Sequence, residues 1–121
     1  MKINKELKEE MLTSMRKILS GKNNPMLSAI IKEKFPDTLF SPIIKIIPEQ
    51  AEDIYWIMID AINIAIIEIP RLSKKTADAK IEIININTYK KHITSKESRR
   101  KLEVAEKIME EYIKNQNTKN G

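Results

Sequence analysis

The chain has 121 residues, 41% of them hydrophobic and 32% charged, which suits one domain with a modest core and argues against disorder. It has no cysteine and only two glycines, so disulfides, thiolate catalysis and glycine-rich phosphate loops are excluded. The N-terminal segment is charged throughout and lacks the apolar region of a secretory signal, so we expect a cytoplasmic protein.

Two helices are predicted at the N-terminus. Between residues 4 and 20 apolar side chains recur every three or four positions, as in an amphipathic helix, and Gly21 would end it. A second, shorter helix is expected to begin near Pro25, which suits a first helical turn, and to end near Lys34. Pro36 stops it, because the residue before a proline avoids helical backbone angles.

The next segment, residues 43–47, is rich in β-branched side chains and bounded by Pro42 and Pro48, so we expect a short strand or extended piece. Pro48 and the carboxylates after it predict the start of a central helix that reaches about Asp60. One face of this helix would carry a stripe formed by Glu49, Asp53, Trp56, Asp60 and Asn63.

The most apolar stretch covers residues 54–69 and raises the question of a membrane span. A spanning helix needs roughly 20 predominantly apolar residues, and this stretch is shorter. It also contains Asp60, Asn63 and Glu68, which are costly inside a bilayer. We therefore expect a core segment and no membrane association.

Isoleucine dominates the second half of that stretch and predicts a strand, because β-branched side chains suit extended backbone. A polar loop separates it from a second isoleucine-rich segment. We predict a small sheet whose hairpin pairs about 62–69 with 80–87. The alternative is one helix over 49–68 in a mostly α-helical bundle. An isoleucine-rich edge strand would also allow a homo-oligomer.

A long C-terminal helix is expected after a cap at Thr94 or Ser95. Its apolar face consists of Leu102, Ala105, Met109, Tyr112 and Ile113. Residues 116–121 are polar and are expected to form a flexible tail to a single domain at 1–115. The predicted fold class is α+β, with two N-terminal helices, a central helix, a small sheet and the C-terminal helix.

Positive charge is concentrated between residues 71 and 101, where ten basic residues stand against three acidic ones, a net +7 within a chain of +5. The candidate partner-binding residues are Lys74, Lys75, Lys90, Lys91, Lys96, Arg99 and Arg100. Such a patch attracts nucleic acid or an acidic protein surface, although it also fits the solvated surface of a lysine-rich protein. The only aromatic residue in this segment is Tyr89, so no platform for stacking nucleobases is evident.

Catalytic and metal-binding patterns are sparse. His92 is the only histidine, and without cysteine or a spaced nucleophile it predicts neither a zinc site nor a catalytic site, so no cofactor is expected. Asp53, Asp60 and Asn63 could bind a divalent ion or serve as acid and base in a carboxylate enzyme, but hydrogen bonding to neighbouring groups is the favoured interpretation.

These observations predict a small non-enzymatic binding protein. The expected partner is a cognate protein with an acidic surface, which the chain would bind as an inhibitor, immunity protein or antitoxin. The alternative is a nucleic-acid-binding protein that uses the basic segment 71–101.

Overall fold

The computed structural model describes residues 2–19, 25–36, 42–72 and 74–120, with side chains for 5–17, 25–36, 42–72 and 74–114. The elements in this part of the chain are α1 (Lys2–Leu19), α2 (Pro25–Lys34), β1 (Ile43–Pro48), β2 (Glu52–Met58), β3 (Asn63–Pro70), the 3-10 helix η1 (Thr76–Asp78), β4 (Lys80–Asn85), α3 (Ile86–His92) and α4 (Lys96–Asn120). The four strands form one antiparallel sheet in the order β1-β2-β3-β4. The α+β class is confirmed, and the mostly helical alternative is wrong.

Helices α1, α2 and α4 agree with the predicted helices. Helix α2 begins at Pro25 and ends at Lys34 as expected. Ser95 is the cap of α4, because its side-chain oxygen accepts a hydrogen bond of 3.0 Å from the Ser98 backbone N–H. The expected stop at Gly21 lies outside the described residues. Helix α4 extends to Asn120, and since the side chains after residue 114 also lie outside them, the flexible tail stays a prediction.

The predicted central helix is wrong, because residues 52–58 form strand β2. A tight connection at Gln50 and Ala51 joins it to β1, and the Glu49 N–H donates to the Glu52 carbonyl at 2.8 Å. The carboxylates after Pro48 therefore mark a hairpin end and not a helical first turn. Aromatic and β-branched residues crowd this segment, and cross-strand packing on both sides outweighs its helix-like start.

The predicted hairpin is confirmed in its first strand and too long in its second. Strand β3 occupies Asn63–Pro70, and Ile67 lies opposite Ile81 of β4. Strand β4 ends at Asn85, because the Asn85 side chain accepts a hydrogen bond of 2.8 Å from the Asn87 N–H and so caps helix α3. The two residues assigned to the strand end, Ile86 and Asn87, belong to that helix.

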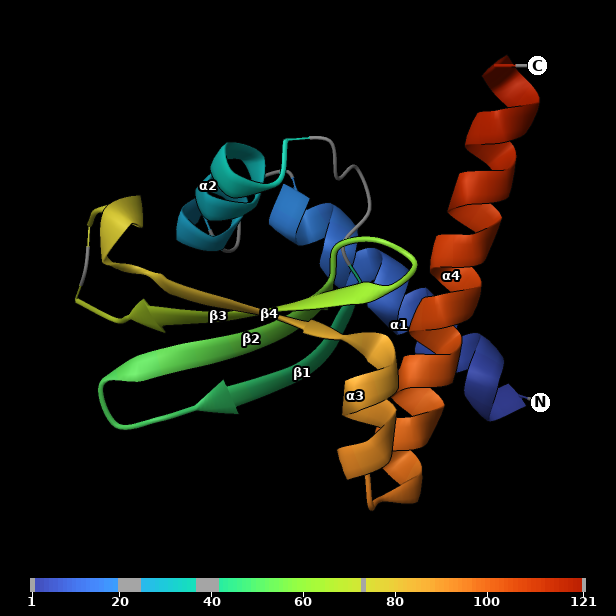
Figure 1. Cartoon of the computed structure of the whole chain (residues 1–121), viewed down its shortest axis with the longest axis horizontal. Helices are drawn as coiled ribbons and strands as arrows, with labels where there is room; N and C mark the ends of the chain where they lie inside the picture. The colour runs from blue at the N-terminus through green and yellow to red at the C-terminus, as the bar shows by residue number, and fades with distance from the viewer. Residues whose placement is uncertain (1, 20–24, 37–41, 73, 121) are drawn as a thin grey trace.

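Helices cover the two faces of the sheet unequally (Figure 1). Helix α2 lies over one face, where a cluster of buried residues comprises Leu27, Ile30, Ile31, Ile57, Ala65, Ile67 and Ile69. Helices α1, α3 and α4 gather at one end of the sheet, and their cluster includes Met58 and Ile64 from the opposite face. The β1–β2 hairpin, the end of β3 and the 3-10 helix η1 lie at the other end. No helix among the described residues is long and apolar enough to cross a membrane.

Candidate functional site

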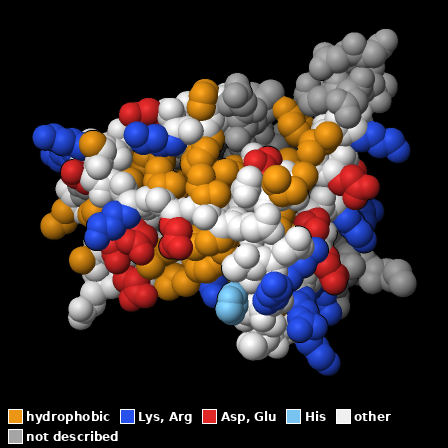
Figure 2. Space-filling view, viewed as in Figure 1, with side chains coloured by type: hydrophobic (Ala, Val, Ile, Leu, Met, Phe, Trp, Pro, Cys, Tyr) orange, Lys and Arg blue, Asp and Glu red, His pale blue; other side chains and the backbone are white. Residues whose placement is uncertain are grey.

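Five of the seven candidate cations lie together at the junction of α3 and α4. This group, the basic corner, consists of Lys90, Lys91, Lys96, Arg99 and Arg100. All five side chains are exposed. Figure 2 shows Lys and Arg side chains beside the single histidine on the lower right of the molecule, over α3 and the start of α4 in Figure 1.

Helix α3 is held against the sheet by Ile86 and Tyr89, which are buried. The ring of Tyr89 packs against Trp56 of β2 with 5.4 Å between their centroids. Burial also raises the pKa of the Tyr89 hydroxyl above its ordinary value of 10.0. Since the inward face of α3 is occupied in this way, Lys90 and Lys91 are left on its solvent side.

The first turns of α4 present the other three cations. Ile93 and Leu102 are buried, and the Ser95 cap sets where the helix begins. Lys96, Arg99 and Arg100 are three and four residues apart, so their side chains share one face of the helix. The connection and the cap therefore place three charges on one solvent-facing surface beside those of α3.

Most charges of the basic corner are not neutralised within the chain. Lys90 forms an ion pair with Glu106 at 3.2 Å, and this partly exposed pair is worth little in water. Among the described residues, no ion pair involves Lys91, Lys96, Arg99 or Arg100. A hollow of about 270 Å³ between α3 and α4 is lined by Lys90, Ile93, Arg99, Leu102, Glu103 and Glu106. The corner thus combines unpaired cations with a partly apolar depression.

Lys74 and Lys75 lie elsewhere. They precede η1 at the end of the sheet that projects away from α3 and α4 (Figure 1). The Thr76 hydroxyl donates a hydrogen bond of 2.7 Å to the Glu33 carboxylate and so ties this region to α2. The structure therefore divides the predicted basic segment into two separate surfaces, which neighbouring positions in the sequence could not reveal.

The carboxylate stripe expected on a helix does not form. Asp53 pairs with Arg71 at 3.0 Å, beside the β1–β2 hairpin. Asp60, in the β2–β3 turn, accepts hydrogen bonds of 2.8 and 2.7 Å from the backbone N–H groups of Ile62 and Asn63. Extended backbone separates the two aspartates by roughly 20 Å, at about 3.3 Å per residue. Both carboxylates are used structurally, and they cannot act on one substrate atom.

Asn63 and His92 also have placements that bear on catalysis. The Asn63 amide donates to the Asp60 carboxylate at 3.1 Å and completes the β2–β3 turn. His92 is exposed at the end of α3. Within the described part of the chain, no three His, Cys, Asp or Glu side chains are grouped so that they could hold a metal ion.

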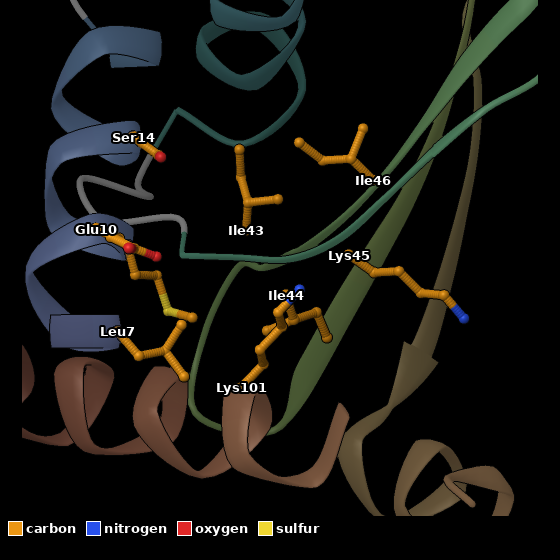
Figure 3. Close-up of a pocket in the computed structure, with 9 residues that line it drawn as sticks. Leu7, Glu10, Ser14, Ile43, Ile44, Lys45, Ile46 and Lys101 are labelled. Atoms are coloured by element: carbon orange, nitrogen blue, oxygen red, sulfur yellow. The ribbon is translucent and has the colours of Figure 1, made fainter. Parts of the chain in front are cut away.

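Sequence reasoning missed a second hollow, of about 250 Å³, beside strand β1 (Figure 3). Figure 3 shows Leu7 and Glu10 reaching from α1 toward β1, with Lys101 contributed by α4. Ile46 of β1 also lines it and is 54% exposed. The sequence feature that could have pointed to this region is the pair of prolines around residues 43–47. Proline is tolerated mainly at sheet edges, so the pair indicates that β1 is an edge strand.

Comparisons of the chain with protein-family models, with curated proteins and with solved structures gave no match. Functional inference therefore depends on the geometry of this chain.

Proposed function

We propose that this is a non-enzymatic binding protein that uses the basic corner to dock on the acidic surface of a cognate protein, as an inhibitor of the immunity or antitoxin kind does. The observation that carries the proposal is a set of four exposed cations that have no acidic partner within the described part of the chain: Lys91, Lys96, Arg99 and Arg100. Unpaired cations on one surface accelerate encounter with an acidic partner and orient it.

The hollow in the basic corner supports a protein partner over nucleic acid. Buried Ile93 and Leu102 contribute to its lining, and an apolar depression suits an inserted side chain. Tyr89, the segment's only aromatic residue, is buried against Trp56 and is not available to stack on a nucleobase.

The test is capture of partners by the tagged chain, compared with the variant Lys96→Glu/Arg99→Glu/Arg100→Glu. These side chains make no ion pair with any described residue, so the reversal should leave folding intact and remove the partner from the captured fraction. The matched control is Lys32→Glu/Lys34→Glu/Lys74→Glu, which changes the net charge equally on exposed residues outside the basic corner. Equal capture by both variants would refute the assignment of this surface.

Nucleic acid is examined separately by mobility shift with duplex and single-stranded probes at increasing salt. Binding through phosphate contacts would weaken steeply with salt and would be lost in the basic-corner variant but not in the control. We expect no such shift at physiological salt. A salt-sensitive shift would instead favour the nucleic-acid-binding alternative.

A further inference from the structure

Strand β4 is the last strand of the sheet, and no strand among the described residues pairs with its outer edge. The Ile86 N–H donates to the Ile62 carbonyl at 2.8 Å, which fixes the alternation of the β3–β4 ladder. In an antiparallel pair every second residue bonds inward, so Lys80, Glu82 and Ile84 bond to β3. The N–H and C=O groups of Ile81 and Ile83 consequently point away from the sheet.

This edge is open to solvent. Figure 2 shows a white band of backbone and uncharged polar side chains crossing the molecule where Figure 1 draws β4, with hydrophobic side chains above and below it. No described element lies in front of the strand in either view. The Ile83 side chain is 52% exposed, which is high for isoleucine in a strand. An open edge of this kind is a template for another strand.

We propose that the β4 edge binds the β4 edge of a second copy of this chain, antiparallel and centred on Ile81. Outward-bonding residues must face each other across such a junction, so the two-fold axis passes through a residue of the strand. Both Ile81 and Ile83 lie opposite residues 79–85 of the second copy only when the axis passes through Ile81, Glu82 or Ile83, because other centres set one of them against η1 or α3. Charge then selects among these three registers.

Centring on Glu82 sets this carboxylate against Glu82 of the second copy, which is repulsive. Centring on Ile83 sets Glu82 against Ile84 and leaves its charge without a partner. Centring on Ile81 sets Glu82 of each copy against Lys80 of the other, giving two opposite-charge pairs. Strand β4 is therefore complementary to itself in one register.

The same register also continues the apolar face of the sheet. It brings Ile81 against Ile81 of the second copy and Ile83 against Ala79. Ile81 already packs on the cluster beneath α2, so the two clusters would join across the junction. The result would be an eight-stranded sheet with the basic corners of both copies left free. This inference is independent of the proposed partner protein.

The first experiment is a charge swap followed by sedimentation velocity over a range of protein concentrations. Wild-type protein should dimerise reversibly, and Glu82→Lys and Lys80→Glu should each weaken the dimer about tenfold or more. The double variant Lys80→Glu/Glu82→Lys should regain most of the affinity. Glu68 lies opposite Lys80 in the same sheet and would limit full recovery. The control Glu49→Lys, on the β1–β2 hairpin, should dimerise like wild type.

Other outcomes would overturn the inference. These are a wild-type chain that is monomeric throughout, a dimer unaffected by Glu82→Lys, and a double variant no better than either single one. The Lys96→Glu/Arg99→Glu/Arg100→Glu variant should still dimerise, so failure of the partner proposal and failure of this one are distinguishable.

The register is read with introduced cysteines, since the chain has none of its own. Residues that exchange both hydrogen bonds lie about 5.5 Å apart between Cα atoms, within the range of a disulfide. Under mild oxidation Ile81→Cys should crosslink two chains faster than Ile83→Cys. Faster crosslinking at position 83 would refute the register centred on Ile81.

Discussion

The two edge strands of the sheet, β1 and β4, have the same length but differ in the features that oppose pairing with another strand. Ile46 of β1 and Ile83 of β4 are almost equally exposed, at 54% and 52%. Strand β1 nevertheless contains Pro48 and an irregular register between Ile43 and Lys45, and α1 and α4 contact it. Strand β4 has neither proline nor irregularity, and helix α3, which follows it in the chain, contacts it.

Proline, bulges and covering helices are the means by which proteins prevent unwanted pairing at a sheet edge. Both edge strands are rich in isoleucine, yet proline and an irregular register occur on β1 and not on β4. Amino-acid composition alone therefore does not decide whether an edge can pair with another strand. Proline, the irregular register and the contacts with α1 and α4 are the features that distinguish β1 from β4. The β4 edge is therefore the place where a further strand can add to this sheet.

The largest expected effect is a difference in the free energy of unfolding between a buried isoleucine of β1 and an exposed isoleucine of β4. Ile44 is 3% exposed and belongs to the cluster beneath α1 and α4, so Ile44→Ala should lower the free energy of unfolding by about 2–5 kcal/mol. Ile83→Ala, at the other edge, should cost about 0.5 kcal/mol or less in the monomer. Urea unfolding of both variants measures the difference, and similar losses would mean that the edges are equally covered.

A second comparison places proline at equivalent positions. The Glu49–Glu52 hydrogen bond sets the β1 ladder so that the Ile46 N–H points outward, as does that of Ile83. Both substitutions should therefore spare the intrachain ladder and cost similar stability. Ile83→Pro should weaken the proposed dimer about tenfold or more, because each copy loses a donor at the junction, whereas Ile46→Pro should not change it. Sedimentation at matched concentrations distinguishes them, and weakening by both would deny any special role to β4.

The smallest effect concerns Lys45 of β1. Its ammonium lies 5.4 Å from the centre of the Trp56 ring, and such contacts at exposed sites are worth about 0.5–1 kcal/mol. Lys45→Ala should lower the free energy of unfolding by about this amount and leave self-association unchanged. Lys45→Arg, which keeps the cation, should retain most of the stability. A change in dimer affinity would show that β1 takes part in association.

Local patterns predicted the helices well and the middle of the chain poorly. Helix α2 was predictable at both ends because Pro25 favours a start and Pro36 forces a stop. Strand β2 was mistaken for helix because Asp53, Trp56 and Asp60 match helical spacing. In the structure Asp53 and Trp56 lie in the strand, and Asp60 lies in the turn after it. A short apolar segment fits both the helical period and the strand period of hydrophobic residues. Pairing with β1 and β3 on both sides makes residues 52–58 a strand.

The candidate site could be predicted only in part, because it depends on which cations lie close together in the folded chain. Charge counting identified the basic segment, including every member of the basic corner. It could not anticipate that Asn85 caps α3, which turns the chain and carries Lys90 and Lys91 toward α4. Nor could it separate Lys74 and Lys75, which the length of strand β4 places at the other end of the sheet.

The sequence by itself determined the two N-terminal helices, the long C-terminal helix and the positive charge of residues 71–101, and it favoured the α+β class and strand β3 over a helical bundle. Periodicity, proline positions and β-branching act over a few residues and can be read directly from the chain. Tertiary structure alone decided that residues 52–58 form a strand, that the cations divide into two surfaces and that α1 and α4 pack against β1. These outcomes depend on which faces and edges meet across the whole domain, and that choice is made by long-range packing.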